Sequence, residues 1–145
     1  MTIRQQEIMD ALGARLQTIQ VRNGYLTDIG NNVVEWKTQL TEDDDLPVLT
    51  YRDTLEDTKI PTRLHQHELT VEIEVITASG STTPMMIRMM KTDILAAIGK
   101  DPFFGKKAIK TVPTQYTTTI EQNDKIIGGA KMLFIITYAT AEWQT

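Results

Sequence analysis

The 145-residue sequence contains no cysteine, and this absence excludes several kinds of chemistry. Disulfide bonds, thiolate metal sites and cysteine nucleophiles all require a thiol, so this chain cannot form them. The longest apolar run, Met132–Ile136, is too short to span a bilayer. The N-terminal residues lack the apolar core of a secretory signal peptide. We therefore expect the protein to be made and to act in aqueous surroundings, without a membrane.

Positive charge is also scarce. The chain has 15 lysines and arginines against 19 aspartates and glutamates, which gives a formal net charge of -4. A surface that grips nucleic acid concentrates Lys and Arg, so this balance argues against such a surface. It is compatible with a protein that lets DNA pass without holding it. The length fits a single domain over residues 1–145 with one sizeable core.

Apolar residues at helical spacing predict two helices, from Ile3 to Ile19 and from Pro84 to Ile98. Thr2 and Gln5 have the spacing of a capping box at the start of the first helix. Thr83 can cap the second helix, and Pro84 suits its first turn. Both segments should therefore pack an apolar stripe against a common core.

Alternating apolar and polar residues predict the clearest strand, between Glu68 and Val75. One face of this strand should lie in the core. Three glutamates should share the opposite, wet face: Glu68, Glu72 and Glu74.

Further strands and a hairpin complete the expected fold. We predict an α+β protein with one mostly antiparallel, mixed sheet, two helices on one face, and the order α-β-β-β-α-β-β. The polar segment Asp53–Arg63 is predicted to be a long loop. The remaining strands are expected at Thr27–Thr38, Leu46–Arg52, Val112–Ile120 and Ala130–Tyr138, with a hairpin turn at Gln122–Lys125.

Clusters that could carry chemistry are few. His65 and His67 are two apart on a strand and could share a metal, but no further histidine or cysteine can complete a site. Two solvated histidines are the more common outcome. The acidic run Glu42–Asp45 lacks the ligand spacing of a calcium loop, and we interpret it as a solvated loop. We therefore predict no catalytic, cofactor-binding or metal-binding residues, and no enzymatic activity.

Candidate contact residues lie in the expected loops. Exposed charges and loop aromatics can anchor a partner protein. The methionines on the second helix could also contact a partner, but methionines at such positions more often pack in the core. The candidates are Asp53, Glu56, Asp57, Lys59, Arg63, Phe103 and Phe104.

Several segments, in this order, resemble the tail terminator (minor tail or tail-completion) proteins of long-tailed bacteriophages. The resemblance extends over essentially the whole chain, and its motifs are structural rather than catalytic. The segments are IRQQEIMDALGARLQTI, NGYLTDIGNNVVEWK, LPVLTYRD, HELTVEIEV and IGGAKMLFIITYATAEW.

The resemblance implies a virion structural protein. Members of this family form a ring, usually a homohexamer, on the last ring of tail-tube protein and stop tube growth. The ring also joins the head–tail connector or neck protein, and in contractile tails it meets the sheath. DNA passes through its lumen without specific binding. The implied location is the head-proximal end of the virion tail, after assembly in the host cytoplasm.

Two questions stay open at the level of sequence. We hypothesise that Glu68, Glu72 and Glu74 line or approach the lumen and repel DNA phosphates. The equally weighted alternative is that they only solvate the outer sheet face. A head-completion or neck ring protein is the first alternative function, and a small-molecule-binding regulatory module is a less favoured one.

Overall fold

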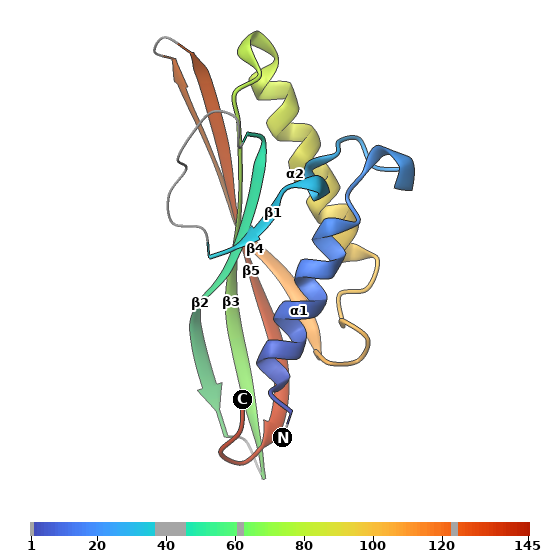
Figure 1. Cartoon of the computed structure of the whole chain (residues 1–145). Helices are drawn as coiled ribbons and strands as arrows, with labels where there is room; N and C mark the ends of the chain where they lie inside the picture. The colour runs from blue at the N-terminus through green and yellow to red at the C-terminus, as the bar shows by residue number, and fades with distance from the viewer. Residues whose placement is uncertain (1, 37–45, 61–62, 123–124) are drawn as a thin grey trace.

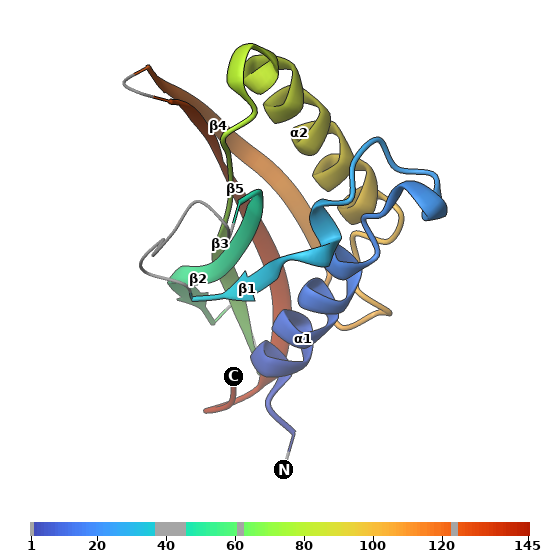
Figure 2. The ribbon, with the colours of Figure 1, turned by 45° about the horizontal axis from the view of Figure 1, so that its top comes forward.

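The protein forms one mixed sheet of five strands with two α-helices on one side (Figures 1 and 2). The computed structural model describes residues 2–36, 46–60, 63–122 and 125–145. The predicted α+β fold is confirmed. Strand order across the sheet is β1-β2-β3-β5-β4. The elements are α1 (Arg4–Gln17), β1 (Val33–Glu35), β2 (Val48–Lys59), β3 (Leu64–Thr77), α2 (Thr83–Gly99), β4 (Lys110–Gln122) and β5 (Ile126–Ala141).

Most strand pairs are antiparallel, and β1 pairs with β2 in parallel. The strand predicted at Thr27–Thr38 is much shorter than expected, since only Val33–Glu35 pairs. A 3₁₀ turn, η2 (Ile29–Asn31), precedes it. Gly30 in this turn lies so close to α1 that a Cβ atom would come within 2.6 Å of the Ile19 carbonyl oxygen. The close approach leaves no room for a side chain at this position of the turn. Residues 37 and 38 lie outside the described residues.

The core lies between the helices and one face of β3 and β5. Every second residue faces the helices and is buried, from His65 in β3 and from Gly128 in β5, as the alternating pattern predicts. Each fully buried Leu, Ile or Phe contributes about 1.5–3 kcal/mol of transfer free energy. The helices supply Ile8, Leu12, Leu16, Ile87, Met90 and Ile94, and the strands supply Leu69, Val71, Ile73, Met132, Phe134 and Ile136.

The buried carboxylate of Asp93 fixes the loop between α1 and β1 to α2. It accepts hydrogen bonds from the Leu26 amide (2.9 Å), the Thr27 amide (2.8 Å) and the Thr27 hydroxyl (2.6 Å). A buried carboxylate is tolerated only when its oxygen atoms accept hydrogen bonds, and these three donors supply such bonds to Asp93.

The helix starts differ from the predicted caps. Ile3 is the N-cap of α1 and makes no side-chain cap bond, while Gln5 donates instead to Asp53 at 2.7 Å. The predicted capping box is therefore wrong. At the start of α2 the Thr83 hydroxyl accepts from the backbone amide of Ser79 at 3.0 Å, so it does not cap the helix. None of the helices in the described ranges is long and apolar enough to cross a membrane.

The loop predicted at Asp53–Arg63 is mostly strand. β2 continues to Lys59 and pairs with β3, with a bulge at Thr54 between Asp53 and Leu55. The prediction was wrong because both faces of this outer segment are wet, so no apolar alternation marks it. Residues 61 and 62 lie outside the described residues.

The predicted hairpin of β4 and β5 is confirmed, with one correction to its facing. Strict alternation along the predicted strand Val112–Ile120 would place Val112 and Tyr116 on the same face. A bulge between Pro113 and Gln115 breaks the alternation, so Val112 pairs with Ile135 and Tyr116 with Met132, on opposite faces. Part of the predicted turn, residues 123 and 124, lies outside the described residues.

The two ends of the chain lie together at one end of the molecule. The Arg4 amide donates to the Thr145 carbonyl oxygen at 2.8 Å. The end of β4, the start of β5 and the start of α2 lie at the opposite end (Figure 1). The molecule is therefore elongated along its strands and has two distinct ends.

Candidate assembly surfaces

The three glutamates of β3 share the sheet face that points away from the helices. Glu68, Glu72 and Glu74 alternate with buried residues of the core face, as the sequence predicts. Their side chains are only partly exposed, and that of Glu72 is 12% exposed.

Basic side chains from the neighbouring strands pair with all three glutamates. The row is thus a ladder of mixed charge and not an open acidic surface. Opposite charges this close largely cancel each other beyond the screening length of about 8–10 Å. Local sequence could not reveal this, because it does not say which strands are neighbours. The contacts are Lys59–Glu68 (3.1 Å), Arg52–Glu72 (2.6 Å), Lys131–Glu72 (3.5 Å) and Lys131–Glu74 (3.9 Å).

The candidate residues of β2 are divided between the two faces of the sheet. Asp53 and Glu56 point to the helix side, where Asp53 accepts from Gln5 and from the Trp36 indole (3.2 Å). Asp57 and Lys59 point to the outer face, opposite Glu68 and Gln66. These residues therefore do not form one contact surface.

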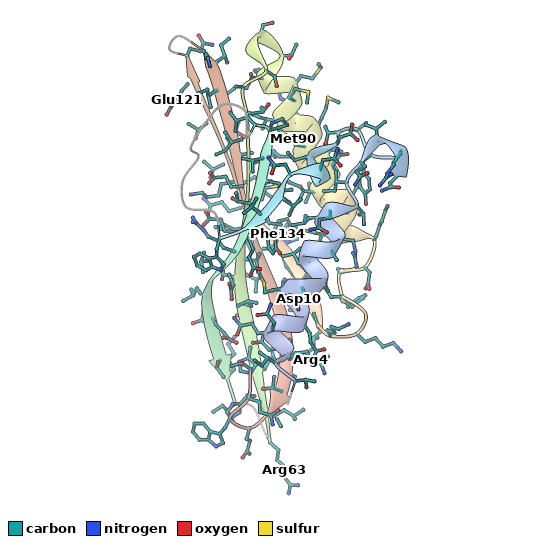
Figure 3. All side chains as sticks on the ribbon, in the orientation of Figure 1. Arg4, Asp10, Arg63, Met90, Glu121 and Phe134 are labelled. Atoms are coloured by element: carbon teal, nitrogen blue, oxygen red, sulfur yellow. The ribbon has the colours of Figure 1, made fainter. Side chains whose placement is uncertain are left out.

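Arg63 stands apart from the other candidates. It is exposed and points away from the molecule at the end opposite Glu121 (Figure 3). Arg63 therefore remains available to a partner at the end where the chain termini meet.

The prediction of two solvated histidines is wrong, since His65 and His67 are buried on the core face of β3. His67 stacks on Tyr138 with ring centroids 4.7 Å apart, and its Nδ1 lies 3.1 Å from Glu56. The Tyr138 hydroxyl also donates to Glu56. Burial raises the pKa of Tyr138 well above its usual range, and the Glu56 carboxylate raises this pKa further.

The Thr140 hydroxyl, the His67 imidazole and the Glu56 carboxylate thus lie in a row in space. Thr140 Oγ1 is 2.8 Å from His67 Nε2, and His67 Nδ1 faces Glu56. However, the Thr140 hydroxyl donates to the Gln144 carbonyl oxygen at 3.0 Å, so its proton is not directed at the imidazole. The Trp143 amide donates to His65 Nδ1 at 3.4 Å. This polar cluster fixes the segment after β5 to the sheet. Among the described residues, no group of three His, Cys, Asp or Glu side chains could hold a metal ion.

The two loop aromatics have different positions. Phe103 is 49% exposed and remains a candidate contact residue. Phe104 is 1% exposed, has a backbone φ of 49°, and packs in the core, with the Arg15 guanidinium 5.6 Å from its ring centroid. The expectation that both rings lie at the surface is therefore corrected for Phe104.

The loop is held by Asp101, which accepts from the amides of Gly105 (2.8 Å) and Phe103 (3.1 Å). These bonds, chiefly that from Gly105, lower the pKa of Asp101 below its usual range. Fixing the loop in this way turns Phe104 inward.

Sequence reasoning missed the exposed edge formed by β4. Val112, Tyr116 and Ile120 are all exposed along this strand. The absence of charge between Lys110 and Glu121 was visible in the sequence, but the edge position of the strand was not. A long strand without charge is unusual at a sheet edge.

Four other exposed apolar side chains lie near the two lateral edges of the sheet. Trp36 and Leu55 lie beside the β1–β2 end of the sheet, and Phe103 and Ile109 lie in the loop that leads into β4.

No protein-family model and no curated protein matches this chain. The fold is a small α+β domain with apolar side chains exposed near both lateral edges of its sheet.

Proposed function

We propose that this protein is a virion structural subunit that forms a ring on the end of a bacteriophage tail tube. The ring stops tube growth and offers the surface to which the head connector joins. The proposal starts from the resemblance of five successive sequence segments to tail terminator proteins. It assigns the protein no catalytic role, and its partners are further copies of itself, tail-tube protein and the neck.

One structural observation supports a ring more than any other. A ring closes through heterologous contacts, in which one surface of a subunit meets a different surface of the next. The strand order places β1 and β4 at opposite edges of the sheet. Trp36 and Leu55 are exposed near the first edge, and Phe103 and Ile109 near the second. Such aromatic and aliphatic side chains are typical anchors of protein interfaces.

The charge ladder on the outer face refines the hypothesis about DNA passage. Arg52, Lys59 and Lys131 each form an ion pair with a glutamate, so they are poorly available to bind DNA phosphates. If this face lines the lumen, it lets DNA pass because it offers few unpaired charges rather than because it repels strongly. Reversal of Glu68, Glu72 and Glu74 to lysine would then make the face basic and slow DNA ejection. Unchanged ejection would remove this face from the lumen.

Electron microscopy with mass measurement of the purified protein tests the proposed function. We expect a six-fold ring with an open centre, either alone or after addition of tail-tube protein. Trp36→Ala should weaken the ring, while Ile3→Ala serves as the matched control at another exposed apolar residue. A protein that stays monomeric in both conditions would contradict the proposal. Binding to a head connector but not to tubes would favour the neck protein instead.

A further inference from the structure

The edge strand β4 is unprotected along its second half. Within the described residues it pairs on one side only, with β5. Sheet edges are usually protected by charges, prolines or bulges. Pro113 and the adjacent bulge protect the first half of β4. From Gln115 to Ile120 the sequence QYTTTI has no charge, proline or glycine, and consists mainly of residues with high β propensity.

The helix side of this segment carries uncovered apolar surface. α2 packs over β3 and β5. Tyr116 and Ile120 are 41% and 38% exposed, and the Lys91 ammonium of α2 lies 5.2 Å from the centroid of the Tyr116 ring. On the other side of the sheet, Thr117 and Thr119 border a hollow that Ile76 also lines.

We propose that the free edge of β4 pairs with β4 of a second copy of this chain, antiparallel, about a two-fold axis at Thr118. Strand addition to an open edge satisfies backbone donors and acceptors that otherwise face water. Contacts about a two-fold axis are self-complementary, and this segment has the required symmetry. The resulting cross-strand pairs are Tyr116 with Ile120, Thr117 with Thr119, and Gln115 with Glu121.

This register is favoured over its neighbours by the side chains that it brings together. Aromatic residues opposite β-branched residues, and threonine opposite threonine, are among the stabilising cross-strand pairs. A two-fold axis at Thr117 would place Tyr116 opposite Thr118 and Ile120 opposite Thr114, so both apolar pairs would be lost. An axis nearer the start of β4 would include the bulge. With the axis at Thr118, no like charges face each other, because Glu121 lies opposite Gln115.

The two-fold contact does not depend on the proposed ring. It uses the hairpin end of β4, whereas the ring contact proposed above uses side chains beside β1 and in the loop before β4. An isologous contact of this kind can join two rings or two free subunits. A copy paired in this way also covers an edge that would otherwise aggregate.

The absence of cysteine allows a direct test by disulfide cross-linking. Residues opposite each other in an antiparallel pair have Cα atoms about 4.5–5.5 Å apart. A disulfide spans about 4.4–6.8 Å between Cα atoms, so Thr118→Cys should form a covalent dimer under mild oxidation. Gln122→Cys is the matched control on the same strand. Its counterpart in the second copy would lie eight residues away along the strand, so this variant should stay monomeric on a denaturing gel.

A second variant measures the contact without a cross-link. Thr118→Lys places two like charges opposite each other and should weaken dimerisation at least about tenfold in Kd. Thr92→Lys adds the same charge at an exposed site on α2 and should leave the mass distribution unchanged. Circular dichroism of both variants verifies that the subunit remains folded.

Two results would overturn the proposal. One is a Thr118→Cys protein that is no more cross-linked than Gln122→Cys. The other is a folded Thr118→Lys protein with unchanged dimerisation. Either result leaves the proposed function standing if six-fold rings are still seen. Conversely, specific cross-linking of Thr118→Cys without any ring would support the β4 contact and count against the proposed function.

Discussion

Replacing Asp93 by alanine tests how the loop between α1 and β1 is held against α2. The carboxylate accepts from the Thr27 amide, the Thr27 hydroxyl and the Leu26 amide. Thr27 is buried, so in the Asp93→Ala protein its two donors would lose their partner without gaining water. Leu26 is half exposed, and its amide can find water more easily.

The expected magnitude follows from these three donors. Each buried donor left unsatisfied costs about 1–2 kcal/mol, and the partly solvated Leu26 amide adds less, which together gives about 3 kcal/mol. Alanine has a higher helix propensity than aspartate and returns about 0.5 kcal/mol. We therefore expect Asp93→Ala to lower the free energy of unfolding by about 2–3 kcal/mol. Asp93→Asn keeps one acceptor oxygen and should cost about half as much.

Urea denaturation followed by circular dichroism measures these differences. Asp10→Ala is the matched control, because Asp10 is exposed on α1 and accepts a hydrogen bond from the Gln6 side chain in the same helix. That substitution should change stability by less than about 0.5 kcal/mol. If Asp93→Ala cost no more than Asp10→Ala, the carboxylate would not be what holds this loop.

Two further predictions concern a close backbone approach and a loop carboxylate. Gly30→Ala would bring a Cβ within 2.6 Å of the Ile19 carbonyl oxygen and should cost about 2–3 kcal/mol in urea unfolding. Gly99→Ala meets open space and should be neutral or stabilising by up to about 1 kcal/mol; equal effects would refute the steric argument. The lowered pKa of Asp101 means that its ionised form stabilises the fold above the unfolded-state pKa, and that this contribution is lost as the pH falls through the folded-state pKa. Asp101→Asn should therefore destabilise the protein at pH 7, and its difference from the unchanged protein in thermal unfolding should shrink as the pH falls below about 4. A difference that stays constant with pH would refute the role of the charge.

Strong periodic patterns predicted the main elements, whereas weak patterns failed. Alternation in β3 and helical spacing in α1 and α2 gave the correct element types, because one buried face imposes a regular pattern. The extension of β2 to Lys59 had no such signal, since its side chains are wet on both faces. The bulge at Thr114 changes which residues share a face. Pro113 beside it is typical of an edge strand or a bulge, but it does not say which of the two occurs.

The candidate surfaces were less predictable than the fold. The sequence placed Glu68, Glu72 and Glu74 on one face, but the basic partners of these glutamates come from β2 and β5, which are distant in the chain. The burial of Phe104 depends on a loop conformation with positive φ at that residue. Such features follow from tertiary packing, and a single sequence read locally does not contain them.

The meeting of the two chain ends has a practical consequence for microscopy. Arg4 and Thr145 are joined by a backbone hydrogen bond, at the end of the molecule away from the start of α2 (Figure 1). A small tag at either terminus would therefore mark the same pole of the molecule. In any assembly on a tube, one gold-labelled tag would reveal whether the hairpins point toward the tube or toward the head. A label placed at the other terminus would provide an independent measurement of the same polarity.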